Sequence, residues 1–105
     1  MKKPKSKLQV WWIPQVPCKS FKVPVSSLEE ARLVLDTLGM YDLFQLDNKI
    51  KPDYSNAGGL QIFNEKENEW EDWWDDETGE DFDEYSARLG WDHAATIKKA
   101  TEEGN

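Results

Sequence analysis

The chain has 105 residues and a net charge of −8, with 38% hydrophobic and 32% charged residues. Its length fits one domain and excludes two, and its apolar content is too high for a wholly disordered chain. Cys18 is alone, which excludes an intramolecular disulfide, and no apolar run approaches the roughly 20 residues that span a bilayer. We therefore expect a protein of the reducing cytoplasm that is neither exported nor inserted into a membrane.

Two strands are predicted after a basic arm at residues 1–6. Residues 7–13 alternate with apolar side chains on both faces, which is typical of a central strand. Residues 19–25 alternate more cleanly, and Pro24, which has no N–H to donate, indicates an edge strand. The side chains expected to face inward from this second strand are Phe21, Val23 and Val25. The short separation of the two strands predicts a hairpin.

The clearest helix signal follows the second strand. A serine with a glutamate three residues later, the pattern of a capping box, occurs at 26–29 and again at 27–30. Apolar residues then recur at helical spacing; they are Leu28, Ala31, Val34, Leu35 and Leu38. Gly39 is expected to end this helix, because glycine favours the position after a helix C-terminus. Residues 41–46 fit either a short second helix or a strand, and helix is favoured.

The second half of the chain begins with a predicted loop at 47–58, which is rich in turn formers. Gly58 and Gly59 are expected to form the turn into a third strand at 60–64. A fourth strand is predicted at 69–74, with Trp70 and Trp74 on one face and Trp73 on the other.

An acidic turn then leads to a predicted helix from Asp81, with Phe82, Tyr85 and Leu89 on one face. Glu84 and Arg88 are four residues apart in the order that favours an ion pair. The expected fold is α+β: a small two-layer sandwich with a mostly antiparallel sheet of about four strands, in ββαββα order. Residues 7–91 form the predicted single domain, and residues 92–105 a helical or frayed tail.

The candidates for catalysis and for metal or cofactor binding are weak. His93 is the one imidazole in the sequence, and Cys18 has no imidazole near it in sequence and is interpreted as a filler at the core edge. Acids at 75–77 with Gly79 miss the spacing of a calcium loop, and the sequence lacks a zinc ligand set. We therefore predict no enzyme, no cofactor and no metal.

The segment at 65–84 is the strongest functional candidate, with twelve acids, one lysine and three tryptophans, whereas residues 1–25 carry six lysines and no acid. One interpretation is a solvated hairpin and helix start whose rings face the core. The other is an interface, because tryptophan is enriched at binding hot spots and carboxylates steer basic partners. The residues expected at this interface are Trp70, Asp72, Trp73, Trp74, Asp75, Asp76, Glu77 and Asp81.

The kind of partner is less determined. Direct nucleic-acid binding is disfavoured by the negative net charge, because phosphate contacts supply most of such affinity. The acids are numerous enough to imitate a short stretch of nucleic-acid charge and to occupy the groove of a nucleic-acid-handling protein. The alternative is a small-ligand binder that sequesters a nucleotide signal near Asn56, Gly58 and Gly59.

Two distinctive strings occur in the chain, WWIPQVP at 11–17 and IKPDYSNAGGLQ at 50–61. Together with the acidic, tryptophan-containing stretch at 69–77, they resemble small accessory proteins of tailed bacteriophages, some labelled superinfection exclusion proteins. The resemblance covers roughly residues 8–85. It implies an infected bacterial cytoplasm and an inhibitor of a host or antiviral-defence protein with a basic surface. A further alternative is exclusion of a second phage near the membrane through the lysine arm; the oligomeric state and the partner stay open.

Overall fold

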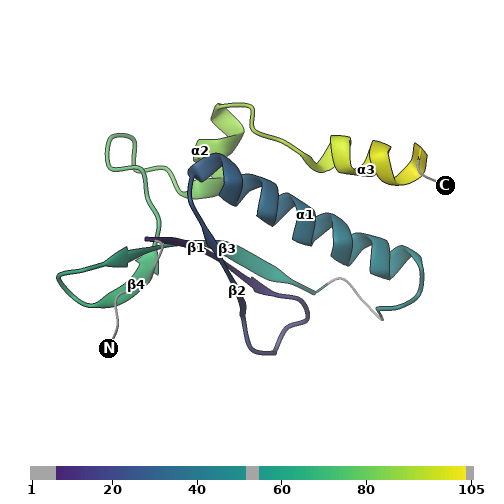
Figure 1. Ribbon diagram of the computed structural model, residues 1–105, viewed down its shortest axis with the longest axis horizontal. Coiled ribbons are helices and arrows are strands. Elements are labelled where there is room, and N and C mark those ends of the chain that lie inside the picture. The colour runs from purple at the N-terminus through teal and green to yellow at the C-terminus, as the bar shows by residue number, and fades with distance from the viewer. Residues whose placement is uncertain (1–6, 52–54, 104–105) are drawn as a thin grey trace.

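The computed structural model describes residues 7–51 and 55–103, and within them it is a small α+β fold. Figure 1 labels its elements, which are β1 (Leu8–Ile13), β2 (Phe21–Val25), α1 (Leu28–Asp47), β3 (Ala57–Asn64), β4 (Glu69–Asp72), α2 (Phe82–Arg88) and α3 (Ala94–Glu103). The predicted ββαββα order is therefore present, and α3 follows it. The basic arm at 1–6 lies outside the described residues.

The four strands form one antiparallel sheet in the order β2-β1-β3-β4. As predicted, β1 is central and β2, which contains Pro24, is an edge strand. The register places Val10 between Val23 and Leu60, so apolar side chains of three strands lie on one face. The helices lie on this side of the sheet (Figure 1).

The core forms between this face of the sheet and the first half of α1. Its buried residues are Val10, Trp12, Val25, Ala31, Leu35, Leu60 and Phe82. The inward prediction for Phe21 was wrong, because Phe21 lies at the end of an edge strand and is 58% exposed. Leu89, predicted on one helix face with Phe82 and Tyr85, is exposed at the C-terminal cap of α2. Cys18 is also exposed, in the β1–β2 connection, and is not a filler of the core.

Helix α1 begins after Ser27, the second of its two predicted caps, but does not end at Gly39. The Ser27 hydroxyl accepts the Glu30 N–H at 3.1 Å, and the Glu30 carboxylate accepts the Ser26 N–H at 3.0 Å. The helix continues for 20 residues and contains the segment predicted as a separate helix. A glycine inside a helix costs only about 1 kcal/mol, which the contacts of the buried Asp42 in the next turn outweigh.

Strand β3 begins at Ala57, three residues earlier than predicted, and Gly58 and Gly59 are part of the strand. A Cβ atom at Gly58 would lie 2.2 Å from the Trp12 ring, and one at Gly59 would lie 2.8 Å from Trp11 Nε1. The absent side chains leave room for the two indoles of β1. The glycines therefore serve strand packing, and the turn predicted there does not exist.

The acidic hairpin after β3 is shorter than predicted, because β4 ends at Asp72. Trp70 is paired with Phe63 on the sheet face away from the helices, and the two rings meet edge-to-face at 5.3 Å. Trp73 has left the strand, although its N–H still donates to the Leu60 carbonyl at 3.1 Å. Trp74 forms an isolated bridge with Asp81, so the predicted alternation of three tryptophans in one strand was wrong.

Helix α2 begins at the predicted Asp81, which forms a complete capping box with Glu84. Arg88 pairs with Glu80 at 3.0 Å and not with the predicted Glu84, whose carboxylate is held by the cap. Helix α3 packs against α1 and has no buried residue among its described side chains. No helix in the described residues is long and apolar enough to cross a membrane.

Candidate functional site

A pocket of about 220 Å³ opens at the sheet edge where β4 ends and β3 continues. Strand β4 pairs only with Gln61–Asn64, so the first half of β3 has no strand partner on this side in the described chain. The pocket lies at this uncovered edge and is lined from both faces of the sheet. Its lining residues are Trp11, Gly58, Gly59, Leu60, Asp72, Trp73, Trp74, Asp81, Phe82 and Asp83.

Trp11 reaches the pocket from β1 by crossing β3. The register places Trp11 opposite Gly59, and the indole nitrogen occupies the space where a side chain at position 59 would begin. Any larger residue at that position would push the ring away from the strand. Gly59 therefore contributes to the site by letting the Trp11 ring lie across the β3 backbone.

The other two tryptophans have different roles. The Trp73 ring meets Phe82 edge-to-face at 5.7 Å and Tyr85 at 5.1 Å, which fixes it against α2. Trp74 is 57% exposed and is therefore the accessible ring of the pocket. A fixed aromatic wall with one exposed ring can bind an apolar side chain or the stem and cation of lysine or arginine.

Three carboxylates lie on the pocket wall. Asp72 is exposed at the end of β4, and its side chain forms no hydrogen bond or ion pair within the described residues. Asp81 is engaged as the α2 cap, accepting the Glu84 N–H at 2.8 Å. Asp83 is 80% exposed although it also pairs with Arg32 at 3.1 Å. The pocket therefore combines aromatic surface with negative charge, and no imidazole or thiol lines it.

The structure brings together six of the residues singled out in the sequence, two from the predicted ligand loop and four from the predicted interface. They are Gly58, Gly59, Asp72, Trp73, Trp74 and Asp81, which had been assigned to two separate sites. Trp70 lies on the open sheet face instead. Asp75, Asp76 and Glu77 lie in the turn beyond Trp74, where Asp75 accepts the Thr78 hydroxyl. The interface residues are thus split between pocket, turn and sheet face.

Sequence reasoning missed Trp11 and Asp83 as pocket residues. The alternation of β1 placed Trp11 on the face opposite Val10, but only the register with β3 shows that it lies over Gly59. Asp83 was noted only as one of many acids. The sequence shows the two tryptophans at 11–12 and the two glycines at 58–59, but not that they pair across the sheet.

Asn56, predicted at a ligand loop, is instead a structural tether. Its side-chain amide donates to Asp42 Oδ2 at 2.9 Å, and Trp12 Nε1 donates to the same atom at 3.0 Å. Lys51 completes the cluster with an ion pair at 3.2 Å, and it also donates to the Pro14 carbonyl. This buried network joins α1, β1 and the segment before β3, and so holds the N-terminal end of β3 in place.

A second polar network fastens α2 to α1. Arg32 contacts Asp36 of its own helix at 3.0 Å, and its Nη1 reaches Asp83 and Ser86 of α2, each at 3.1 Å. The guanidinium also lies over the Phe82 ring, 5.6 Å from its centroid. The network thereby fixes the helix that carries one wall of the pocket.

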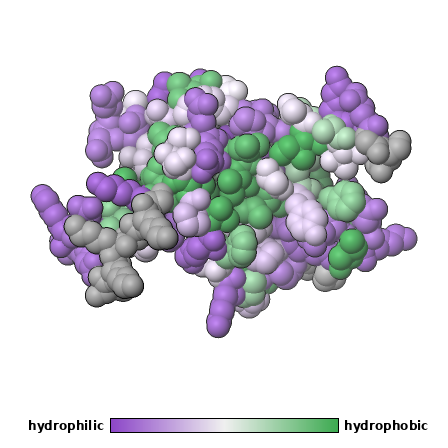
Figure 2. Space-filling view, in the orientation of Figure 1, coloured by the Kyte–Doolittle hydropathy of each residue, from purple (hydrophilic) through white to green (hydrophobic). Residues whose placement is uncertain are grey.

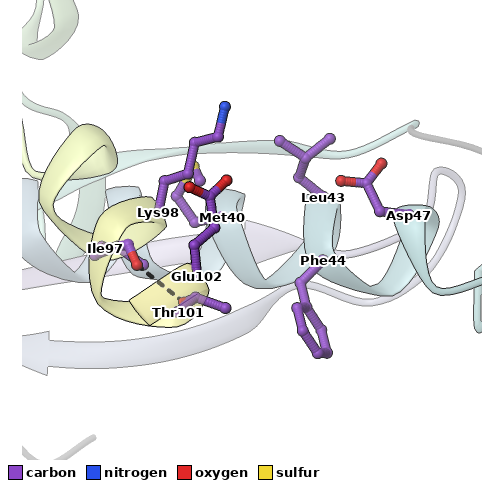
Figure 3. A pocket seen from close by; sticks show the side chains of 8 residues that line it. All are labelled: Met40, Leu43, Phe44, Asp47, Ile97, Lys98, Thr101 and Glu102. Atoms are coloured by element: carbon purple, nitrogen blue, oxygen red, sulfur yellow. Dashed lines mark hydrogen bonds between the residues drawn. The ribbon is translucent and has the colours of Figure 1, made fainter. Parts of the chain in front are cut away.

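A separate hollow lies between α1 and α3. Figure 3 shows Met40, Leu43 and Phe44 of α1 facing Ile97 and Thr101 of α3. Apolar side chains gather along α1 on this side of the molecule, surrounded by hydrophilic ones (Figure 2). The exposed ones on α1 are Leu33, Tyr41, Leu43 and Phe44. This apolar surface is distinct from the acidic pocket in both elements and chemistry.

Most of the chain matches the sequence model of one protein family. Residues 7–91 match the model of the family described as superinfection exclusion gene product 17. The chain belongs to this family. It is also 49% identical to the superinfection exclusion protein of Salmonella phage P22, over 65% of this chain and 77% of that protein. The resemblance to phage accessory proteins is thereby confirmed.

No solved structure matches this chain. All residues that line the acidic pocket, from Trp11 to Asp83, lie within the part that matches the family. Helix α3 lies wholly outside it, so the hollow between α1 and α3 has one wall that the family match does not include. The pocket is therefore the better candidate for a function of the family. Within the described residues no group of three or more histidines, cysteines or acids is placed to hold a metal ion.

Proposed function

We propose that this protein takes part in superinfection exclusion by binding and blocking a protein with a basic surface in the infected bacterial cytoplasm. It does so as a binding protein and not as an enzyme. Membership of the superinfection exclusion family supports the biological role. The partner is a host factor, and a protein of antiviral defence or nucleic-acid handling fits the charge of the site.

The observation that carries the proposal is the convergence of Trp11, Trp74 and Asp72 around one pocket. Aromatic rings supply large contact area and hot-spot energy at interfaces. A cation over an indole ring gains about 0.5–1 kcal/mol at an exposed site and more when desolvated. The remaining acids of the 65–84 segment add a field that speeds encounter with a basic surface. A partner with lysine or arginine side chains therefore fits best.

Imitation of a nucleic acid is not required by this arrangement. Glu69 and Glu71 project to one face of β4 and Asp72 to the other, because strand side chains alternate. The acids of β4 therefore do not form a single row like the phosphates of one strand. A local contact between the pocket and a basic side chain explains the charge more simply.

Sequestration of a nucleotide is the second candidate, because an aromatic pocket exists beside Gly58 and Gly59. Its volume of about 220 Å³ is below the range of roughly 300–1,000 Å³ that is typical of small-ligand sites. Its carboxylates also oppose phosphate. A rise in melting temperature with any member of a nucleotide panel would favour this candidate over a protein partner.

The direct test is phage exclusion by cells that express a variant with three neutralised carboxylates, here called the charge-neutral variant. We expect Asp72→Asn with Asp76→Asn and Glu77→Gln to reduce exclusion at least about tenfold. These three side chains form no hydrogen bond or ion pair in the described part of the chain, so folding should be unaffected. The readout is the plating efficiency of a panel of tailed phages on cells with equal amounts of each protein.

The matched control removes three charges far from the pocket, with Glu29→Gln, Asp47→Asn and Glu102→Gln. Their side chains likewise have no partner in the described residues, and the control keeps the same net charge as the test variant. We expect the control to exclude phages as the natural protein does. Full exclusion by the first variant, or equal loss in both, would refute the acidic site.

A further inference from the structure

The uncovered edge of β3 borders the pocket and exposes strand backbone. Gly58 is exposed, and since glycine has no side chain, its exposed surface is strand backbone. In the described residues no strand pairs with Ala57–Leu60 on the β4 side. The one backbone hydrogen bond that the described chain forms on that side of this segment is from the Trp73 N–H to the Leu60 carbonyl. Exposed strand edges are templates for the addition of another strand.

We propose that Ala57–Gly59 accepts a short extended segment of the partner as an added strand, while a lysine or arginine of that segment enters the pocket. The proposal rests on the function proposed above and specifies how the basic partner is held. Backbone pairing would supply affinity, and the pocket would select the side chain, as in other cases of strand addition. The free edge is about 10 Å long, enough for three to four residues.

The arrangement of the pocket fits this occupant. Side chains of an added strand alternate between the two faces of the sheet, and Trp11 lies across Gly59 on the face away from the helices. A long basic side chain on that face would run along the Trp11 ring toward Trp74. Asp72 lies at the end of the neighbouring strand, where it would neutralise the cation.

The experiment selects random heptapeptides displayed on filamentous phage against the full chain. We expect enriched peptides with one lysine or arginine flanked by residues of high strand propensity. When such a peptide binds the nitrogen-15-labelled protein, the NMR chemical shifts of the backbone amides at residues 57–59 should change. The diagnostic step is N-methylation of the best peptide. Methylation of one alternate set of amides should weaken binding at least about tenfold, and methylation of the other set should not.

The side-chain part is tested on both partners. Replacing the basic residue of the peptide by uncharged citrulline should weaken binding about three- to tenfold, and Trp74→Ala should do the same. Tyr41→Ala is the matched control, because Tyr41 is also 57% exposed but lies on α1, outside the pocket. It should leave the affinity unchanged.

Three results would overturn strand addition: no enriched peptide, equal effects of methylation at both sets of amides, or shifts confined to residues outside 57–59. The proposed function fails separately. If exclusion is lost in the charge-neutral variant while methylation has no directional effect, the basic partner stands and strand addition is wrong. If the peptides pair with the edge while that variant excludes normally, the edge binds peptides but does not serve exclusion.

Discussion

Asp42 is a buried carboxylate, only 3% exposed, on which three donors from distant parts of the chain converge. We predict that Asp42→Ala lowers the free energy of unfolding by about 3–5 kcal/mol, because it leaves the buried Lys51 ammonium without its partner. The total free energy of unfolding of a domain of this size is on the order of 5–10 kcal/mol, so this loss is a large part of it. Urea denaturation measures the change.

The control for this prediction is Asp47→Ala in the last turn of the same helix. Asp47 is exposed and lies near the negative end of the helix dipole, so its removal should change stability by no more than about 0.5 kcal/mol. An equal loss of stability in both variants would show that the buried network does not hold the fold together.

The two glycines of β3 make a second comparison at the residue scale. We predict that Gly58→Ala destabilises the protein by about 1–3 kcal/mol, because its Cβ would overlap the Trp12 ring, which is buried in the core. Gly59→Ala should cost less, because Trp11 is only partly buried and is able to shift. It should nevertheless weaken phage exclusion by displacing the pocket wall. Thermal unfolding and plating efficiency together test the pair, and equal stability losses would contradict it.

These glycines also show what single residues do not reveal before the structure is known. Turn formation is the commonest role of a glycine pair, and the sequence around it is rich in turn formers. The requirement for glycine at both positions is non-local, because each glycine lies against a tryptophan of β1 that is about 47 residues earlier in the sequence. A local rule cannot detect a steric requirement that arises from strand register.

At the scale of elements, Arg32 fastens α2 to α1. We predict that Arg32→Lys accelerates amide hydrogen exchange in α2 while α1 stays protected, because an ammonium cannot reach Asp36, Asp83 and Ser86 at once. The loss of global stability should be about 1–3 kcal/mol. Uniform exchange across both helices would show instead that α2 is held by Phe82 packing alone.

Element ends were predicted well where a cap is local and poorly where tertiary contacts decide. Ser27 and Asp81 begin their helices as expected, because each cap depends on residues three positions away. Gly39 did not end α1, because Asp42 must remain helical to receive the Trp12 N–H. Strand β4 ended early for a related reason: Trp73 packs on α2, which draws it out of the strand.

At the scale of the molecule, the sheet and helix order followed from alternation and helical spacing, so the α+β class was predictable. The site was predictable only in part. The acid and tryptophan segment was identified, but Trp11, which also lines the pocket, comes from the basic N-terminal quarter of the chain. Pairing of distant segments, which sets the pocket, is not encoded in the composition of either segment.

Photo-crosslinking from the pocket in infected cells shows whether the pocket contacts a basic partner. A photoreactive benzoylphenylalanine in place of Trp74 should yield one main covalent adduct, to a protein with a basic surface. The yield of this adduct should fall when the crosslinking is repeated in a lysate at high salt, because salt weakens the complex before the covalent bond forms. The same probe in place of the equally exposed Tyr41 should yield none. An adduct at position 41 without one at position 74 would contradict the account and would move the binding surface to the apolar face of α1.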